Sequence, residues 1–173
     1  MPICITNEDI TKMKVDAIVN AANTRLQIGG GVCGAVYKAA GINELQAACD
    51  ELSPIEKGEA VITSGFKLPA KYIIHTSGPV YKNGNLCEES LLRLCYKNSL
   101  DIAWDNGCRS IAFPLISSGV YGYPKKEALS IAINTINNWL QKNDNIIVWI
   151  TLFDKETFNL AKIIFHMYIV EEI

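Results

Sequence analysis

Two loops rich in glycine and serine contain the residues best suited to bind an anion. They are 29–34 (GGGVCG) and 117–124 (SSGVYGYP), and each follows an apolar run and precedes a helix-forming run. The first N–H groups of a helix have no partners within the helix, and the helix dipole favours negative charge there. Glycine also allows consecutive amides to approach phosphate oxygens closely. Two such loops predict a site that could hold a diphosphate between them.

Glycines in front of a helix can also serve a tight turn or close packing of helix and strand, and one loop alone would not distinguish these roles from an anion site. The letters of 29–34 also match the G-x-G-x-x-G motif of dinucleotide folds, in which the glycines follow their strand directly and an acid ends the next strand about 20 residues later. Here NTRLQI intervenes, and Asp50, Glu51 and Glu56 precede the next apolar run. The sequence therefore disfavours a dinucleotide fold.

Strand-like and helix-like segments alternate along the chain. Short apolar runs typical of buried strands cover 3–6, 16–22, 58–65, 71–78, 110–116 and 146–153. Helical periodicity covers 32–40, 88–106, 125–141 and 155–168. This alternation predicts an α/β fold with a largely parallel sheet between two helical layers. Ligands of such sheets bind beyond the carboxyl ends of the strands, where both loops are expected.

Composition narrows the class of protein. With 173 residues, 49% hydrophobic and 20% charged, the chain fits one globular domain over 1–173. Its net charge of −2 argues against nucleic-acid and membrane partners. No apolar run approaches the roughly 20 residues of a membrane span, and no secretory pattern opens the sequence, so we expect a cytoplasmic protein. The six cysteines form no CxxC pair and His75 and His166 stand far apart, so we expect reduced thiols and no metal site.

The sequence also resembles a known family. VDAIVNAAN followed by GGGVCGAVYKAAG, then GEAVITSG, KYIIHTSGP and FPLISSGVYGYP, is similar to the macro domain in the order and spacing of its motifs over almost the whole chain. The resemblance implies a three-layer α/β/α sandwich around a mixed, mostly parallel sheet. It also implies a site for ADP-ribose without any cofactor, and in many members removal of ADP-ribose from modified proteins or cleavage of O-acetyl-ADP-ribose.

Matching the motifs position by position implies roles for individual residues. Asp16 matches an acid that accepts a hydrogen bond from the adenine amino group, and Asp9 and Ile10 match the edge that contacts adenine, although the family usually has glycine where this chain has Glu8. Asn23 matches the residue that reaches the distal ribose, while Asn20 is expected to brace the loop. Amides of two segments would hold the diphosphate: Gly30, Gly31, Val32 and Cys33 on one side, and Ser117, Ser118, Gly119, Val120, Tyr121 and Gly122 on the other.

Three of these residues are the candidates for catalysis. Tyr121 falls where an aromatic ring packs over the distal ribose, Asn23 could hold the attacking water, and Cys33 stands where many hydrolases of the family have aspartate. The family often has histidine or a similar polar residue at the position of Tyr37. An aspartate could orient or deprotonate water, whereas a thiol does this poorly at neutral pH. A water held by Asn23, the loop amides and a phosphate oxygen could still attack the anomeric carbon, with the phosphate as base.

The sequence thus predicts a protein that binds ADP-ribose and hydrolyses the ester link of mono-ADP-ribosylated Asp or Glu side chains, or of O-acetyl-ADP-ribose. Mono-ADP-ribosylated proteins would be its partners. A binding module for ADP-ribose without turnover is the alternative from a different class. A third possibility is a binder or hydrolase of another phosphorylated nucleoside.

Overall fold

The sheet lies at the centre of the fold. The computed structural model describes residues 3–170. Its six strands run in the order β1-β6-β5-β2-β4-β3, and all neighbouring strands are parallel except β3, which pairs antiparallel with β4. Their bounds are β1 Ile3–Thr6, β2 Ala17–Ala21, β3 Ala60–Ser64, β4 Tyr72–Thr76, β5 Ser110–Pro114 and β6 Ile147–Thr151.

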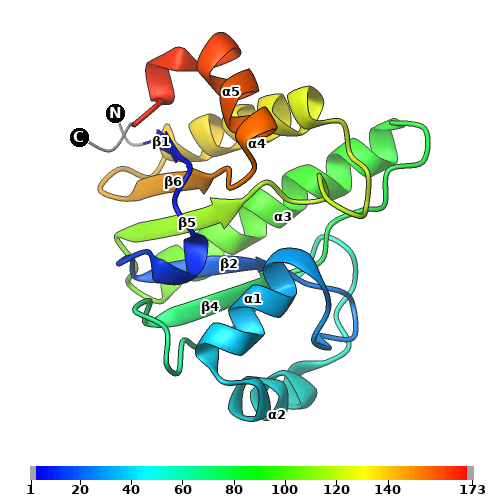
Figure 1. The fold of residues 1–173 in the computed structure, drawn as a ribbon, viewed down its shortest axis with the longest axis vertical. Coiled ribbons are helices and arrows are strands. Elements are labelled where there is room, and N and C mark those ends of the chain that lie inside the picture. Colours follow the sequence, from blue (N-terminus) through cyan, green and yellow to red (C-terminus); the bar gives the residue numbers. More distant parts are fainter. Residues whose placement is uncertain (1–2, 171–173) are drawn as a thin grey trace.

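Helices cover both faces of the sheet (Figure 1). They are α1 Gly31–Ala40, α2 Ile42–Leu52, α3 Leu86–Asp105, α4 Lys125–Leu140 and α5 Lys155–Ile164, with short 3-10 turns η1 Ile10–Lys12 and η2 His166–Tyr168. Two apolar clusters fill the spaces between the layers. One joins α1, α2 and η1 to one face of the sheet, and the other joins α3, α4 and α5 to the opposite face.

The predicted three-layer sandwich with a mixed, mostly parallel sheet is confirmed. All six predicted strand segments contain a strand, and four of the helices were expected. Two details differ. The helix α2 was not predicted, and the helix expected over 155–168 ends at Ile164, where Phe165 leaves helical geometry before η2 begins.

Local capping explains where several helices begin. Asn85 starts α3 by accepting a hydrogen bond from the Glu88 amide at 2.9 Å. Asp154 starts α5, with Oδ1 accepting from the Thr157 amide at 2.9 Å. A side-chain oxygen at this position satisfies one of the otherwise unpartnered first-turn amides. In contrast, Gly30 and Pro124 begin α1 and α4 without any side-chain cap.

The parallel strands β4, β2, β5 and β6 are neighbours, so their carboxyl ends meet at one edge of the sheet. β1 is parallel to β6 and ends at the same edge, so the segments that leave this edge are 7–9, 22–30, 77–85, 115–124 and 152–154. The second predicted anion-binding loop is among them, and the first spans the end of 22–30 and the first turn of α1. Within residues 3–170, no helix has the length and apolar character needed to cross a bilayer.

The Tyr96 hydroxyl provides a test of how the core supports this edge. Tyr96 is fully buried, and its hydroxyl accepts a hydrogen bond from the Ile116 amide at 3.1 Å. Tyr96→Phe leaves that buried amide without a partner, so we expect the free energy of unfolding in urea to fall by about 1–3 kcal/mol. The control is Tyr72→Phe, because the Tyr72 hydroxyl makes no hydrogen bond within residues 3–170; an equal loss in both variants would contradict the prediction.

Candidate functional site

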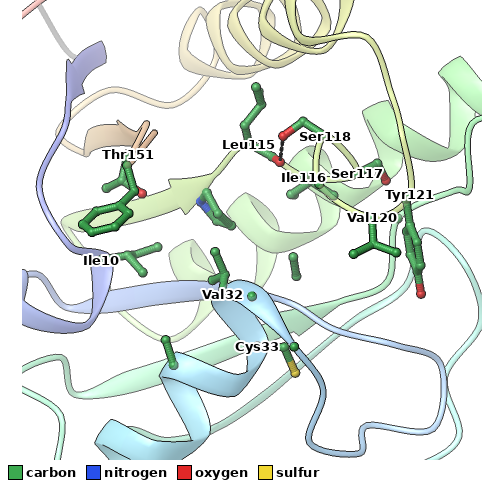
Figure 2. A pocket seen from close by; sticks show the side chains of 18 of the residues that line it. Ile10, Val32, Cys33, Leu115, Ile116, Ser117, Ser118, Val120, Tyr121 and Thr151 are labelled. Carbon is green, nitrogen blue, oxygen red and sulfur yellow. Dashed lines mark hydrogen bonds between the residues drawn. The ribbon is translucent and has the colours of Figure 1, made fainter. Parts of the chain in front are cut away.

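A cleft of about 820 Å³ lies at the carboxyl edge of the sheet. Its walls come from five parts of the chain, and Figure 2 shows Val32 and Cys33 at the start of α1 opposite Ser117, Val120 and Tyr121. The residues that line it are Asp9, Ile10, Ala21, Ala22, Asn23, Gly29–Cys33, Ala35, Gly78, Pro114–Tyr121, Thr151–Asp154 and Thr157.

The first wall is the uncapped beginning of α1. Gly31 adopts a φ of 57°, which favours glycine, and the first turn of α1 contains no acidic residue. Gly34 packs so tightly on the preceding loop that an added Cβ would lie 2.5 Å from the Gly29 carbonyl oxygen. The first amides of α1 are therefore presented to the cleft with the full positive end of the helix dipole.

The loop between β2 and α1 is held from behind by both neighbouring helices. The Tyr37 hydroxyl of α1 donates to the Leu26 carbonyl at 2.6 Å, and Gln46 Nε2 of α2 donates to the same oxygen at 3.0 Å. Gln46 Oε1 also accepts from the Ile28 amide at 3.1 Å. Burial raises the pKa of Tyr37, which keeps this hydroxyl protonated as a donor. The helix that was not predicted thus fixes the loop that carries Asn23.

Asn23 combines a structural and an accessible role. Its Nδ2 donates to the Gln27 carbonyl at 2.8 Å, and its Oδ1 accepts from the Gln27 amide at 3.1 Å. A primary amide has two donor hydrogens and two acceptor lone pairs. One donor hydrogen and one acceptor lone pair of Asn23 remain free after these two bonds, and Asn23 lines the cleft. Asn23 can therefore hydrogen-bond a ligand in an orientation that Gln27 has already fixed.

The second wall is the loop from 115 to 124. Ser118 Oγ donates to the Leu115 carbonyl at 2.8 Å, as the dashed line in Figure 2 marks, and the Tyr123 amide donates to the Ser117 carbonyl at 2.8 Å. Ser117 adopts a φ of 66°. These internal bonds leave the amides of Gly119, Val120 and Tyr121 without partners within residues 3–170. Three free amides therefore belong to the wall that lies opposite the start of α1.

Gly78 packs directly against the second wall. It lies after β4, and an added Cβ would overlap Ser117 Oγ and lie 2.7 Å from Ile116 Cγ2. The space is too small for any side chain. The segment after β4 and the loop after β5 are therefore in direct contact, which fixes the position of the second wall.

The other end of the cleft is formed by η1 and the segment after β6. Asp9 Oδ1 accepts hydrogen bonds from the amide and hydroxyl of Thr11 at 2.9 and 2.7 Å. Its second carboxylate oxygen makes no hydrogen bond within the described residues. Phe153 lines the cleft but is 75% exposed, which is unusual for a phenylalanine beside buried strands. A hydrogen-bond acceptor and an aromatic ring are therefore both available to a ligand at this end of the cleft.

Behind Cys33 lies a buried polar cluster built around His75. Thr63 Oγ1 donates to the Ser64 carbonyl and lies 3.0 Å from His75 Nε2, so it accepts the Nε2 proton. His75 Nδ1 then accepts from Asn20 Nδ2 at 3.2 Å, and this amide also approaches the Cys33 sulfur at 3.8 Å. Complete burial lowers the pKa of His75 to about 4. His75 is therefore neutral at physiological pH and part of the scaffold.

The structure brings most of the predicted site residues together. Those lining one cleft are Asp9, Ile10, Asn23, Gly30, Gly31, Val32, Cys33, Ser117, Ser118, Gly119, Val120 and Tyr121. Gly122 does not line it; with a φ of 74° it closes the turn by donating to the Gly119 carbonyl. The Cys33 side chain is buried and approaches the Gln27 carbonyl at 3.7 Å.

Asp16 requires a correction, because the structure places it at the opposite end of the sheet. It precedes β2, whereas the cleft lies beyond the end of β2. Asp16 Oδ2 accepts from the amides of Arg109 and Ser110 at 2.7 and 3.1 Å. Its carboxylate therefore connects the starts of two neighbouring strands and cannot contact a ligand in the cleft.

The wall after β6 was not predicted from the sequence. Leu152, Phe153, Asp154 and Thr157 all line the cleft, and an aromatic residue directly after a strand that ends at the binding edge was the available signal. Gly78 was also missed. In residues 3–170, no group of three or more His, Cys, Asp or Glu side chains could hold a metal ion.

Comparison with known proteins gives a consistent result. The family model described as Macro domain matches residues 19–132. A macro domain-containing protein of Mesorhizobium japonicum is 56% identical over 135 residues, covering 78% of this chain and 76% of the relative. The ADP-ribose glycohydrolase MACROD2 of Xenopus laevis is 50% identical over 137 residues, which cover 78% of this chain and 32% of that protein. A mutant of the Oceanobacillus iheyensis macrodomain with ADPR superimposes with a TM-score of 0.89 at 42% identity, covering 94% of this chain and 91% of that one.

The buried His75 makes stability depend on pH. Because its folded pKa is about 4, below the ordinary value of 6.5, the unfolded chain binds the extra proton between these values. Stability contributed by neutral His75 is complete above pH 6.5 and is lost as the pH falls toward 4, by up to about 3 kcal/mol. We expect His75→Gln to have a shallower decline of unfolding free energy between pH 7 and 4, measured by urea denaturation. Parallel curves for the two proteins would contradict this assignment.

Proposed function

Because this chain belongs to the macro domain family, we propose that its cleft binds ADP-ribose and that the protein hydrolyses the ester link of mono-ADP-ribosylated Asp or Glu side chains, or of O-acetyl-ADP-ribose. The observation that carries the proposal is the arrangement of the cleft. Two sets of free amides belong to opposite walls in its middle, an acceptor and an exposed aromatic ring lie at one end, and an amide side chain and a tyrosine lie at the other. This order matches adenosine, diphosphate and ribose along one elongated ligand.

The adenine is assigned to the end formed by Asp9, Ile10 and Phe153. The free carboxylate oxygen of Asp9 can accept the adenine amino hydrogen, since a carboxylate offers only acceptors. Phe153 can stack on the base, which would cover a ring that is 75% exposed. Asp9 thus takes the role that the sequence resemblance had given to Asp16.

The diphosphate is assigned to the middle of the cleft. Amides at the start of α1 would contact it from one side and those of Gly119, Val120 and Tyr121 from the other. The uncompensated dipole of α1 favours its negative charge. Binding here requires no metal ion, because both sets of donors are part of the backbone.

The distal ribose is assigned to the end that contains Asn23, Cys33 and Tyr121. Asn23 retains one donor hydrogen and one acceptor lone pair, which suit a ribose hydroxyl or a water molecule. The Tyr121 ring would pack on the sugar. The link to a modified side chain would leave the cleft at this end.

Hydrolysis of the link between the distal ribose and an Asp or Glu side chain then requires only positioning of water and stabilisation of the sugar. A water held by Asn23 attacks the anomeric carbon, the bond from that carbon to the carboxylate oxygen breaks, and the water proton passes to a phosphate oxygen. The products are ADP-ribose and a free carboxylate, which needs no protonation to leave. Such a site accelerates the reaction by orientation and by electrostatic stabilisation of a cationic sugar.

One comparison supports this activity over simple binding, because the relative from Xenopus laevis is named as an ADP-ribose glycohydrolase. The mutant macrodomain of Oceanobacillus iheyensis with ADPR supports the ligand and is compatible with either function. The presence of Cys33 where many hydrolases of the family have aspartate favours the alternative, a module that binds ADP-ribose without turnover. The two candidates therefore differ in chemistry and share one ligand.

Binding measurements separate the roles of Asp9 and Asp16. We expect Asp9→Asn to raise the dissociation constants of both ADP-ribose and ADP about tenfold or more in calorimetry. The substitution would place a hydrogen-bond donor opposite the adenine amino group, where the wild type has a charged acceptor. Asp16→Asn should leave both affinities unchanged while lowering the free energy of unfolding. Weaker binding by Asp16→Asn would overturn the corrected assignment, and failure of ADP to bind to the wild type would favour a different nucleoside.

Turnover tests the role of Asn23. With a protein mono-ADP-ribosylated on Asp and Glu as substrate, we expect the wild type to release ADP-ribose over time and Asn23→Ala to release it at least about tenfold more slowly. Asn134→Ala, which changes an exposed residue of α4, is the matched control. Cys33→Asp should increase the rate without tighter binding if the missing acid limits the chemistry.

Release by the wild type that Asn23→Ala does not reduce would place the chemistry elsewhere. No release by the wild type, together with ADP-ribose binding in the calorimeter, would establish the binding module instead.

A further inference from the structure

Lys57 lies just outside the cleft and contacts two of its walls. It is in the segment between α2 and β3 and is not among the residues that line the cleft. Its Nζ donates a hydrogen bond to the Gly78 carbonyl at 2.9 Å and lies 4.4 Å from the centroid of the Tyr121 ring. Both contacts are to cleft residues, one after β4 and the other after β5. One ammonium group therefore connects the two segments behind the surface that faces a ligand.

The charge of Lys57 has no acidic partner within residues 3–170. The ion pairs of these residues involve Arg93, Lys97 and Lys125 and do not include it. Partial burial lowers the pKa of Lys57 from its ordinary value, which reflects the loss of water around the ammonium. The Gly78 carbonyl and the negative face of the Tyr121 ring are thus the groups that compensate this cation.

The orientation of the Tyr121 ring depends on this contact. The backbone of Tyr121 is already fixed, because its carbonyl accepts a hydrogen bond from the Tyr81 amide at 2.8 Å. Its hydroxyl makes no hydrogen bond within the described residues. The ammonium of Lys57 is therefore the specific polar contact made by the ring. A cation over an aromatic face is attractive by about 0.5–2 kcal/mol, depending on how far it is desolvated.

We propose that Lys57 is a positioning residue that holds the Tyr121 ring in place against the distal ribose of the ligand. The inference rests on the proposed function, in which this end of the cleft takes the distal ribose. It extends that function to a residue that lies outside the cleft and contacts no ligand atom. Lys57 acts on one end of the ligand only, since Asp9 and Phe153 belong to the other end.

The experiment compares two ligands that differ at this end. ADP contains adenosine and the diphosphate, whereas ADP-ribose also contains the distal ribose. Lys57→Met keeps a long unbranched side chain without the charge. We expect it to raise the dissociation constant of ADP-ribose about three- to tenfold in calorimetry and to leave that of ADP unchanged. Lys57→Arg, which retains the cation, should bind both ligands as the wild type does.

Two controls distinguish the ring contact from a general effect of losing a lysine. Lys71 lies 5.2 Å from the ring centroid of Tyr72 at the start of β4, far from the carboxyl edge, so Lys71→Met should leave both dissociation constants unchanged. In a Tyr121→Leu background the ring is gone, so adding Lys57→Met should produce no further loss of ADP-ribose affinity.

Several results would overturn the inference. Equal weakening of ADP and ADP-ribose by Lys57→Met would mean that Lys57 supports the loops as a whole through Gly78. Unchanged affinities for both ligands would mean that the ring is held without it. A full Lys57→Met effect in the Tyr121→Leu background would exclude the ring as intermediary. Failure of the wild type to bind ADP-ribose would instead overturn the proposed function, and the inference with it.

Discussion

Close approach of chain segments without room for a Cβ atom determines the shape of the cleft. Gly34 allows α1 to begin directly against the Gly29 carbonyl, and Gly78 allows the segment after β4 to lie against Ser117 and Ile116. A larger residue at either position would push the two contacting segments apart, because the obstructing atoms belong to backbone or to a packed side chain. The position of each row of amides therefore depends on a close contact of its own wall.

The electrostatics of the cleft follow from which groups carry charge and which do not. The first turn of α1 has no acidic residue, so its dipole is not neutralised within the protein. Beneath α1, His75 is buried and neutral, and it interacts with Asn20 and Thr63 through hydrogen bonds alone. Asp9 provides a carboxylate at the far end of the cleft, where it caps η1. An anion in the middle of the cleft is therefore surrounded by hydrogen-bond donors. The Asp9 carboxylate lies at the end of the cleft where the adenine amino group, a donor, is expected.

Much of this arrangement could be predicted from the sequence, and the exceptions have physical reasons. The two loops were recognisable because glycine and serine follow apolar runs, and parallel pairing then brings 29–34 and 117–122 to one edge. Asp16 was misassigned because a motif match does not show at which end of a strand a residue lies. Only the direction of the strand shows this. Helix α2 buries only Leu45 and Cys49, so most of its surface is exposed and few of its residues mark it as part of the core. Phe153 had a local signal, as an aromatic residue directly after a strand, whereas the role of Lys57 depends on contacts with Gly78 and Tyr121, which no local pattern encodes.

The order of the strands has a consequence for how the protein folds. Central β2 pairs with β4 and β5, and β1 at one edge pairs with β6 from near the other end of the chain. Each of these pairings closes a long loop, and topologies dominated by such non-local contacts fold slowly. Both walls of the cleft require β2, β4 and β5 to be in register. During synthesis the binding surface is therefore incomplete until most of the chain has left the ribosome.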